Sequence, residues 1–127
     1  MLLVEDDPTL CGVLDMILTS AGCTVSAFTD PIEALHKLRG APDLVDIMLS
    51  DFHMPGLQGD ELARQVFALR PNLPVILMSG SGAISVPTHV SALIEKPVTE
   101  TALLRIINSA VEAAQQTSTG ADAAPVA

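Results

Sequence analysis

Short runs of apolar residues alternate with longer amphipathic stretches along the chain. There are five such runs, each mostly apolar, and they cover residues 1–4, 24–27, 47–50, 74–78 and 92–95. A strand exposed on one face would alternate polar and apolar residues, whereas a continuous apolar run is typical of a strand buried on both faces. The pattern therefore predicts a sheet of five buried strands.

The longer stretches repeat apolar residues at helical spacing and carry residues that start or stop helices. Pro8 and the pair Asp30-Pro31 stand where helices begin, and Gly22 and Gly40 stand where they end. The predicted helices cover residues 8–22, 31–40, 60–69 and 99–115. Strands that alternate with helices predict an α/β fold, a doubly wound parallel sheet with helices on both faces. Residues 1–116 would form this one domain, and residues 117–127 a flexible tail.

One connection is short for this architecture. The stretch between Ser79 and Lys96 must hold a loop, a helix and the fifth strand. Residues 83–90 contain Pro87 and have no apolar period of 3.6 residues. The sequence therefore predicts that the fourth helix is shortened to a turn or missing.

Composition and charge exclude several classes of function. The 127 residues carry six Lys and Arg against fifteen Asp and Glu, a net charge of −9, which argues against direct binding of nucleic acid. No apolar run approaches the roughly 18 residues of a membrane helix, so membrane insertion is not expected. Cys11 and Cys23 lack metal-ligand spacing and suit free thiols in a cytoplasmic protein.

Polar residues follow four of the predicted strands at the point where each ends. Glu5 and Asp6 follow the first strand, Asp51 the third, Ser79 the fourth and Lys96 the fifth. The carboxyl ends of parallel strands meet at one edge of a sheet, so these side chains should converge. Three converging carboxylates repel one another unless a cation joins them, and carboxylate oxygens suit Mg²⁺.

An aspartate held beside such a cation can act as a nucleophile toward a phosphoryl group. Asp51 would then become an aspartyl phosphate. Lys96 would neutralise one phosphate oxygen, and the Ser79 hydroxyl would donate to another. Each residue alone is more often a strand end, a cap or a surface charge, and the four strand ends together carry the prediction.

Four segments in this order resemble the receiver domain of response regulators in two-component signalling. The segments are residues 4–8, 46–56, 75–80 and 95–97. The resemblance implies a flavodoxin-like fold of five parallel strands. It also implies a role for each residue of the site: Asp51 the phosphoacceptor, Asp6 a direct Mg²⁺ ligand, Glu5 its acidic partner, His53 a ligand through its backbone carbonyl, Ser79 the switch hydroxyl and Lys96 the phosphate-binding lysine.

The resemblance further implies a signalling partner. A histidine kinase or a histidine phosphotransfer protein would supply the phosphoryl group. The sequence is also compatible with a homodimer. The domain would be a switch that catalyses its own phosphorylation and slow dephosphorylation, not an enzyme for a separate substrate. The first strand begins at Met1 with no lead-in. We take this as favouring the receiver part of a larger protein, such as a hybrid sensor kinase, over a stand-alone receiver.

One departure from the family pattern keeps an alternative open. The family usually carries an aromatic ring three residues before the lysine, where this chain has Leu93. A leucine cannot signal by the ring rotation that accompanies phosphorylation in the family. The alternative is a degenerate receiver that takes no phosphate and acts only as a protein interaction module.

Overall fold

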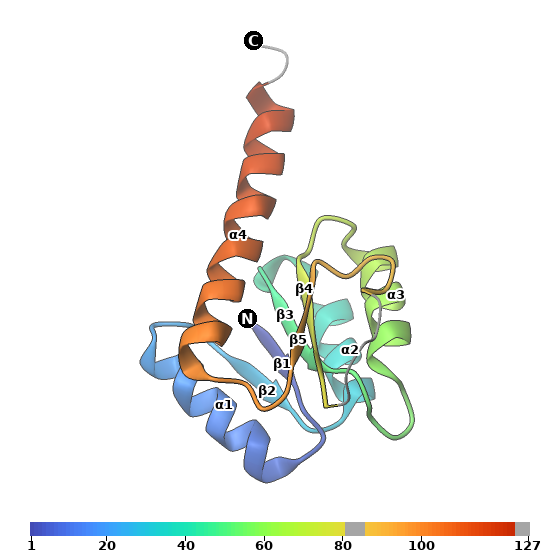
Figure 1. Cartoon of the computed structure of the whole chain (residues 1–127). Coiled ribbons are helices and arrows are strands. Elements are labelled where there is room, and N and C mark those ends of the chain that lie inside the picture. Colours follow the sequence, from blue (N-terminus) through green and yellow to red (C-terminus); the bar gives the residue numbers. More distant parts are fainter. Residues whose placement is uncertain (81–85, 124–127) are drawn as a thin grey trace.

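A single parallel sheet forms the centre of the molecule. The computed structural model describes residues 1–80 and 86–123 of the chain, and Figure 1 shows its five strands side by side. The strands are β1 (Leu2–Val4), β2 (Ser26–Phe28), β3 (Met48–Asp51), β4 (Val75–Ser79) and β5 (Ala92–Glu95), in the order β2-β1-β3-β4-β5. All four neighbouring pairs are parallel. The predicted doubly wound five-stranded fold is therefore confirmed.

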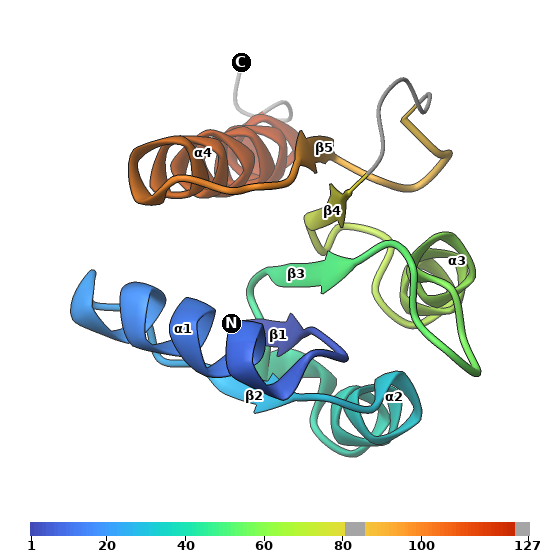
Figure 2. The ribbon, with the colours of Figure 1, turned by 60° about the horizontal axis from the view of Figure 1, so that its bottom comes forward.

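Helices cover both faces of this sheet. The helices are α1 (Pro8–Ser20), α2 (Pro31–Gly40), α3 (Gly59–Leu69) and α4 (Glu100–Ala123), with a 3₁₀ turn, η1 (Pro42–Leu44), before β3. Seen along the sheet in Figure 2, α1 and α4 lie on one side and α2 and α3 on the other. This two-sided cover explains why the strand sequences do not alternate polar and apolar residues.

Two apolar clusters fill the space between sheet and helices. Alternate residues of β1 divide between them, since Leu3 enters the cluster under α1 and α4 whereas Leu2 and Val4 enter the one under α2 and α3. Strand β4, which lies between β3 and β5, is buried along its whole length. The side-chain period of two thus sends residues of β1, β3, β4 and β5 into both cores.

Side-chain caps fix where three helices begin. They thereby also fix the ends of the loops that lead from the strands to these helices. The Asp7 carboxylate accepts from the amides of Thr9 and Leu10, at 3.0 and 3.4 Å, and opens α1 directly after β1. Asp30 and Thr99 cap α2 and α4 in the same way. Because each cap satisfies amides that have no partner inside the helix, these polar residues favour their helix starts.

The arginine that follows α3 holds the entrance to β3. The Arg70 guanidinium donates to the carbonyl of Pro42 and, at 2.9 Å, to that of Val45. These contacts tie η1 and the residues before β3 to the end of α3. The strand that ends in Asp51 is therefore anchored at its beginning as well as by its neighbours.

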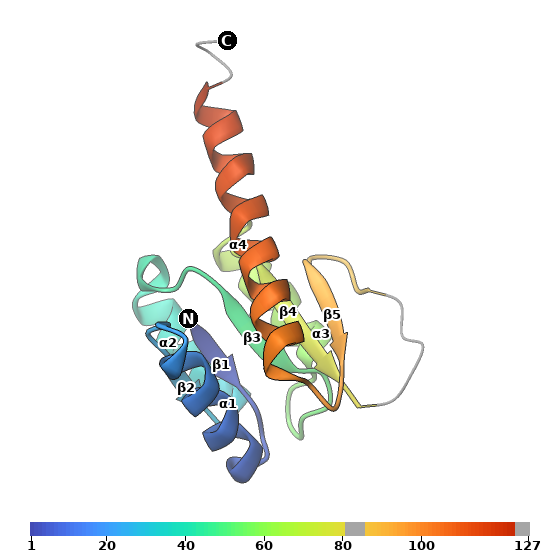
Figure 3. The same ribbon diagram turned by 60° about the vertical axis from the view of Figure 1, so that its left-hand side comes forward.

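The start of β2 and the end of α4 differ from the predicted boundaries. Strand β2 begins at Ser26, two residues later than predicted, because Ser26 is the partner of Leu2 at the start of β1. Helix α4 is longer than predicted and runs to Ala123, past the sheet as Figure 3 shows. Its Ala and Gln residues after 112 are good helix formers, and Gly120 lowers helix stability without ending the helix. Of the predicted tail, residues 124–127 lie outside the described residues.

The prediction for the fourth helix concerns a segment that is described only in part. Residues 81–85 lie outside the described residues. Residues 86–91 contain no helix, and a turn closed by the amide of Val90 on the carbonyl of Pro87, at 3.3 Å, stands there instead. His89 in this turn has a φ of 72°. Its ring stacks on Phe67 of α3, with 3.9 Å between the ring centroids.

Candidate functional site

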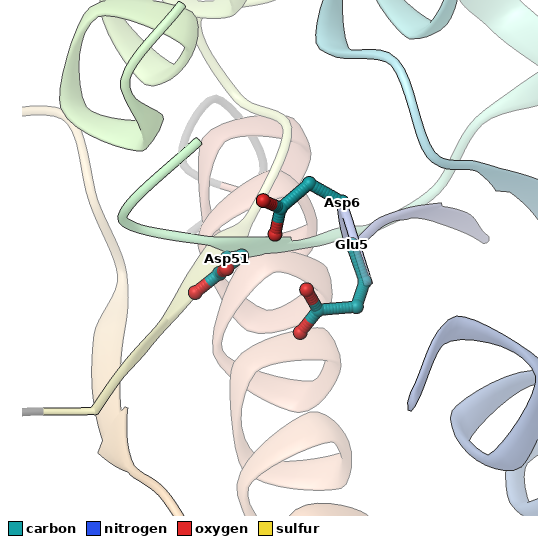
Figure 4. A group of neighbouring side chains, drawn as sticks. All are labelled: Glu5, Asp6 and Asp51. Atoms are coloured by element: carbon teal, nitrogen blue, oxygen red, sulfur yellow. The ribbon is translucent and has the colours of Figure 1, made fainter. Parts of the chain in front are cut away.

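Three carboxylates meet where β1 and β3 end. Glu5 and Asp6 directly follow β1, and Asp51 is the last residue of β3, the strand beside it. One carboxylate oxygen from each of the three lies within 4.8 Å of the others, and Figure 4 shows the three groups around a common space. The predicted convergence of these carboxylates at one sheet edge is confirmed.

Glu5 is the most buried member of the cluster. Its side chain is fully buried, and its two oxygens accept from different partners: Oε1 from Lys96 Nζ at 2.8 Å and Oε2 from the Asp7 amide at 3.2 Å. Burial raises the pKa of Glu5, and the nearby Asp6 and Asp51 raise it further, against the lowering effect of Lys96 and the Asp7 amide. Glu5 therefore binds a proton more readily than an ordinary glutamate.

Lys96 connects two of the three carboxylates. It follows β5, and its Nζ lies 2.8 Å from Glu5 Oε1 and 3.1 Å from Asp51 Oδ1. Partial burial lowers the pKa of Lys96, but its contacts with Glu5 and Asp51 outweigh this effect and the pKa is raised overall. The ammonium group is therefore charged and partly neutralises the acidic cluster.

Ser79 lies on the same edge, at the end of β4. It is buried, and its strand neighbour Met78 is the register partner of Asp51. The Ser79 carbonyl accepts from the amide of Lys96 at 2.7 Å, so the backbone segments that carry the hydroxyl and the ammonium group are directly joined. The peptide from Lys96 to Pro97 is cis. Because all five strands are parallel, the four predicted strand ends lie on one edge of the sheet.

His53 lies in the loop between Asp51 and α3. Its side chain is exposed, and its ring meets that of Phe52 edge-on, with 4.9 Å between the centroids. The loop is fixed by Met54, which is buried in the core under α2 and α3. The prediction for His53 concerns its backbone carbonyl as a metal ligand, and the exposed position of the ring does not conflict with it.

Two small residues beside Asp51 escaped the sequence analysis. The Ser50 hydroxyl donates to the Asp51 carbonyl at 2.9 Å, and Gly59, the first residue of α3, packs against the same carbonyl. Ser50 stands next to Asp51 in the sequence, which was the available signal. Gly59 reaches Asp51 only because the intervening loop folds back, and no sequence pattern shows that contact.

The chemistry of the donor set suits a hard divalent cation that also accepts a phosphate oxygen. Three clustered carboxylates carry up to three negative charges, and the single ammonium group of Lys96 balances only part of them. Mg²⁺ takes few protein carboxylates and keeps positions for water or phosphate. Asp51, Lys96 and Ser79 stand at the same edge of the sheet, and a carboxylate, an ammonium group and a hydroxyl are the groups that phosphoryl transfer uses.

Known proteins with similar sequences are regulators much longer than this chain. It is 42% identical over 91 residues to the C4-dicarboxylate transport transcriptional regulatory protein DctD of Rhizobium meliloti, a match covering 72% of this chain and 19% of that protein. It is 34% identical over 119 residues to the transcriptional regulatory protein GlrR of Escherichia coli, covering 88% of this chain and 26% of that protein. The chain thus spans about a fifth to a quarter of the length of these relatives.

Solved structures agree with the fold. A response regulator receiver domain protein from Clostridium thermocellum matches with a TM-score of 0.86 at 23% identity, covering 91% of this chain and 96% of that one. A CheY-like receiver domain protein from Methanospirillum hungatei matches with a TM-score of 0.84 at 26% identity, covering 91% and 95%.

Two further findings concern the chain as a whole. In the described part of the structure, none of the helices has both the length and the apolarity to cross a membrane. The family model described as the response regulator receiver domain matches residues 1–108. The chain therefore belongs to the receiver domains of response regulators, the phosphate-accepting modules of two-component systems.

Proposed function

We propose that Asp51 is the residue that accepts the phosphoryl group. The observation that carries this proposal is the position of its carboxylate, which is buried at the end of β3, beside Glu5 and Asp6 and 3.1 Å from Lys96 Nζ. A carboxylate in this position is shielded from bulk water and faces groups that can neutralise an incoming phosphate. Asp51 ends β3, the strand between β1 and β4, whereas Glu5 and Asp6 lie in the loop after β1.

The same cluster supports a Mg²⁺ site in this chain. Receiver domains generally bind Mg²⁺ in their acidic pocket, and the three carboxylates here match the oxygen ligands that this ion prefers. Asp6 and Asp51 would bind it directly, Glu5 through water, and His53 through its backbone carbonyl. The bound ion would neutralise negative charge on the phosphoryl group during transfer.

The transfer itself moves one phosphoryl group between two protein side chains. A carboxylate oxygen of Asp51 bonds to phosphorus while the bond from phosphorus to the donor histidine nitrogen breaks, and the electron pair of that bond stays on the nitrogen. Lys96 Nζ and the Ser79 hydroxyl would then each contact a phosphate oxygen. To do so, the Lys96 ammonium group must loosen its contact with Asp51. Because Lys96 directly follows β5, phosphorylation of Asp51 would then change the contacts at the end of that strand.

The partner in this reaction would be a histidine kinase or a histidine phosphotransfer protein. Receiver domains interact with histidine kinases, and the chain would act as a self-phosphorylating switch, not as an enzyme for a separate substrate. An apolar hollow of about 400 Å³ lies between α1 and the segment from Lys96 to Val98 that precedes α4. Because it adjoins the acceptor edge, it suits the apolar side chains of a docking helix.

The direct test is phosphorylation by a small donor. Incubation of the chain with acetyl phosphate and Mg²⁺ should add the mass of one phosphoryl group, and chelation of the metal should prevent the addition. Intact mass spectrometry measures the adduct, and fragmentation after stabilisation of the acyl phosphate locates it. An unmodified chain would refute the proposal and favour the interaction-module alternative. A phosphoryl group on Ser79 or a histidine would refute Asp51 as the acceptor.

The buried Glu5 makes metal binding sensitive to pH. Because the folded-state pKa of Glu5 lies above its ordinary value of 4.5, protonated Glu5 contributes stability that is complete below that value and is lost as the pH rises through the folded pKa. Mg²⁺ favours the ionised form, so its affinity should fall as the pH decreases through the folded pKa of Glu5. Isothermal titration with Mg²⁺ over a series of pH values measures this fall.

The matched variant for this prediction is Glu5→Gln. It keeps the size of the side chain and removes the proton that competes with the metal. Its Mg²⁺ affinity should be weaker near neutral pH and should change less as the pH is lowered. An equal pH dependence in the two proteins would show that another group competes with the metal.

A further inference from the structure

Gly59 approaches the backbone of the acceptor residue so closely that no larger residue fits. A Cβ atom on Gly59 would lie 2.5 Å from the Asp51 carbonyl oxygen and 2.8 Å from the Cα atom of Phe52. Both contacts involve backbone atoms, which cannot rotate away as the end of a side chain can. The φ of Gly59 is not in the left-handed region, so space and not backbone conformation requires a glycine here.

The backbone at this point is held from two sides. The Phe52 amide donates to the carbonyl of Met78 at 2.8 Å, which fixes the peptide between Asp51 and Phe52 to β4. The amide and carbonyl of one trans peptide point in opposite directions, so the Asp51 carbonyl points away from β4. There it meets Gly59 and accepts the hydroxyl of Ser50 at 2.9 Å.

The same glycine also closes the loop that follows the acceptor. Its amide donates to the Phe52 carbonyl at 2.7 Å and joins the two ends of the loop that contains His53. Helix α3 cannot easily retreat, because Leu62, Ala63 and Val66 behind Gly59 are buried in the core. A displacement at Gly59 would therefore reach the peptide that carries Asp51 and the start of the His53 loop.

We propose that Gly59 and Ser50 are positioning residues for phosphoryl transfer. Together they hold the Asp51 carbonyl and so set the direction of the acceptor carboxylate and of the His53 backbone. This inference rests on the proposed function of Asp51 and adds two residues that act through it. Neither residue is among the groups proposed to bind the phosphoryl group or the metal.

The test compares two glycine-to-alanine variants, Gly59→Ala and Gly12→Ala. Gly12 lies in α1, and a Cβ atom there would meet nothing within 4 Å. Alanine is the better helix former at both positions, so the two variants differ mainly in the close contact with Asp51. Three readouts are compared: Mg²⁺ affinity by titration calorimetry, the rate of phosphorylation by acetyl phosphate, and the amide resonances of Phe52 and His53.

Gly59→Ala should bind Mg²⁺ about tenfold more weakly than wild type. It should also accept phosphate about 100-fold more slowly, since small misplacements of reacting groups have effects of this size. Gly12→Ala should match wild type in both. Because affinity and rate are measured on the folded protein at a temperature well below its melting point, a merely structural role would lower the melting temperature and leave both values unchanged.

A folded Gly59→Ala protein with the Mg²⁺ affinity and phosphorylation rate of Gly12→Ala would overturn the inference. If Gly59→Ala does not fold, Ser50→Ala decides instead: it should show a smaller loss of the same two values, and wild-type values would overturn the inference. Wild-type protein that takes up neither Mg²⁺ nor phosphate would instead refute the proposed function. Even then, unshifted Phe52 and His53 amides in folded Gly59→Ala would refute the positioning role separately.

Discussion

The Asp51→Asn variant should take up no phosphoryl group from acetyl phosphate under conditions that modify the wild-type chain completely. The amide that replaces the carboxylate is a poor nucleophile and cannot form an acyl phosphate. The substitution also removes one of the three carboxylates of the cluster, so Mg²⁺ binding should weaken at the same time. Intact mass spectrometry after incubation with acetyl phosphate and Mg²⁺ measures the first effect, and calorimetric titration the second.

Asp43→Asn makes the same chemical change away from the site. Asp43 is exposed in the turn η1, ahead of the strand that carries Asp51. Its variant should be phosphorylated like wild type and should bind Mg²⁺ with unchanged affinity. Retained phosphorylation of Asp51→Asn at wild-type level would place the acceptor elsewhere in the chain.

Much of this site could be predicted because its residues end strands or directly follow them. Glu5 follows the apolar run 1–4, and Asp51 follows the run 47–50, and short apolar runs of this kind are typical of buried strands. A parallel sheet then dictates that the residues after each strand meet at one edge. The convergence of the acidic cluster therefore needs no knowledge of individual side-chain contacts.

Contacts between distant segments could not be predicted in this way. The sequence predicted that Lys96 binds a phosphate oxygen, but it did not predict that the Lys96 Nζ contacts both Glu5 and Asp51. Gly59 escaped notice because its role depends on an approach of 2.5 Å that only the folded loop creates. Both features depend on distances across the fold, on which apolar periodicity and helix caps carry no information.

The boundary of α4 shows a different limit. Small and polar residues after position 115 have the composition of a tail, and the sequence analysis interpreted them so. The helix nevertheless continues to Ala123, because no residue before Pro125 prevents the next turn from forming. Composition alone separates a weak helix from a flexible tail poorly when several alanines are present.

The position of Lys96 between two buried carboxylates predicts opposite effects of its removal on stability and on metal binding. Lys96→Ala should lower the free energy of unfolding of the metal-free protein by about 2 kcal/mol, since Glu5 and Asp51 lose a charged partner inside the fold. Mg²⁺ supplies positive charge to the same carboxylates, so its addition should stabilise Lys96→Ala more than it stabilises wild type. Urea denaturation with and without Mg²⁺ measures both changes. Lys37→Ala on the exposed side of α2 serves as the control and should follow wild type. An unchanged unfolding free energy, or a smaller gain from Mg²⁺ in Lys96→Ala than in wild type, would show that the lysine does not balance the cluster.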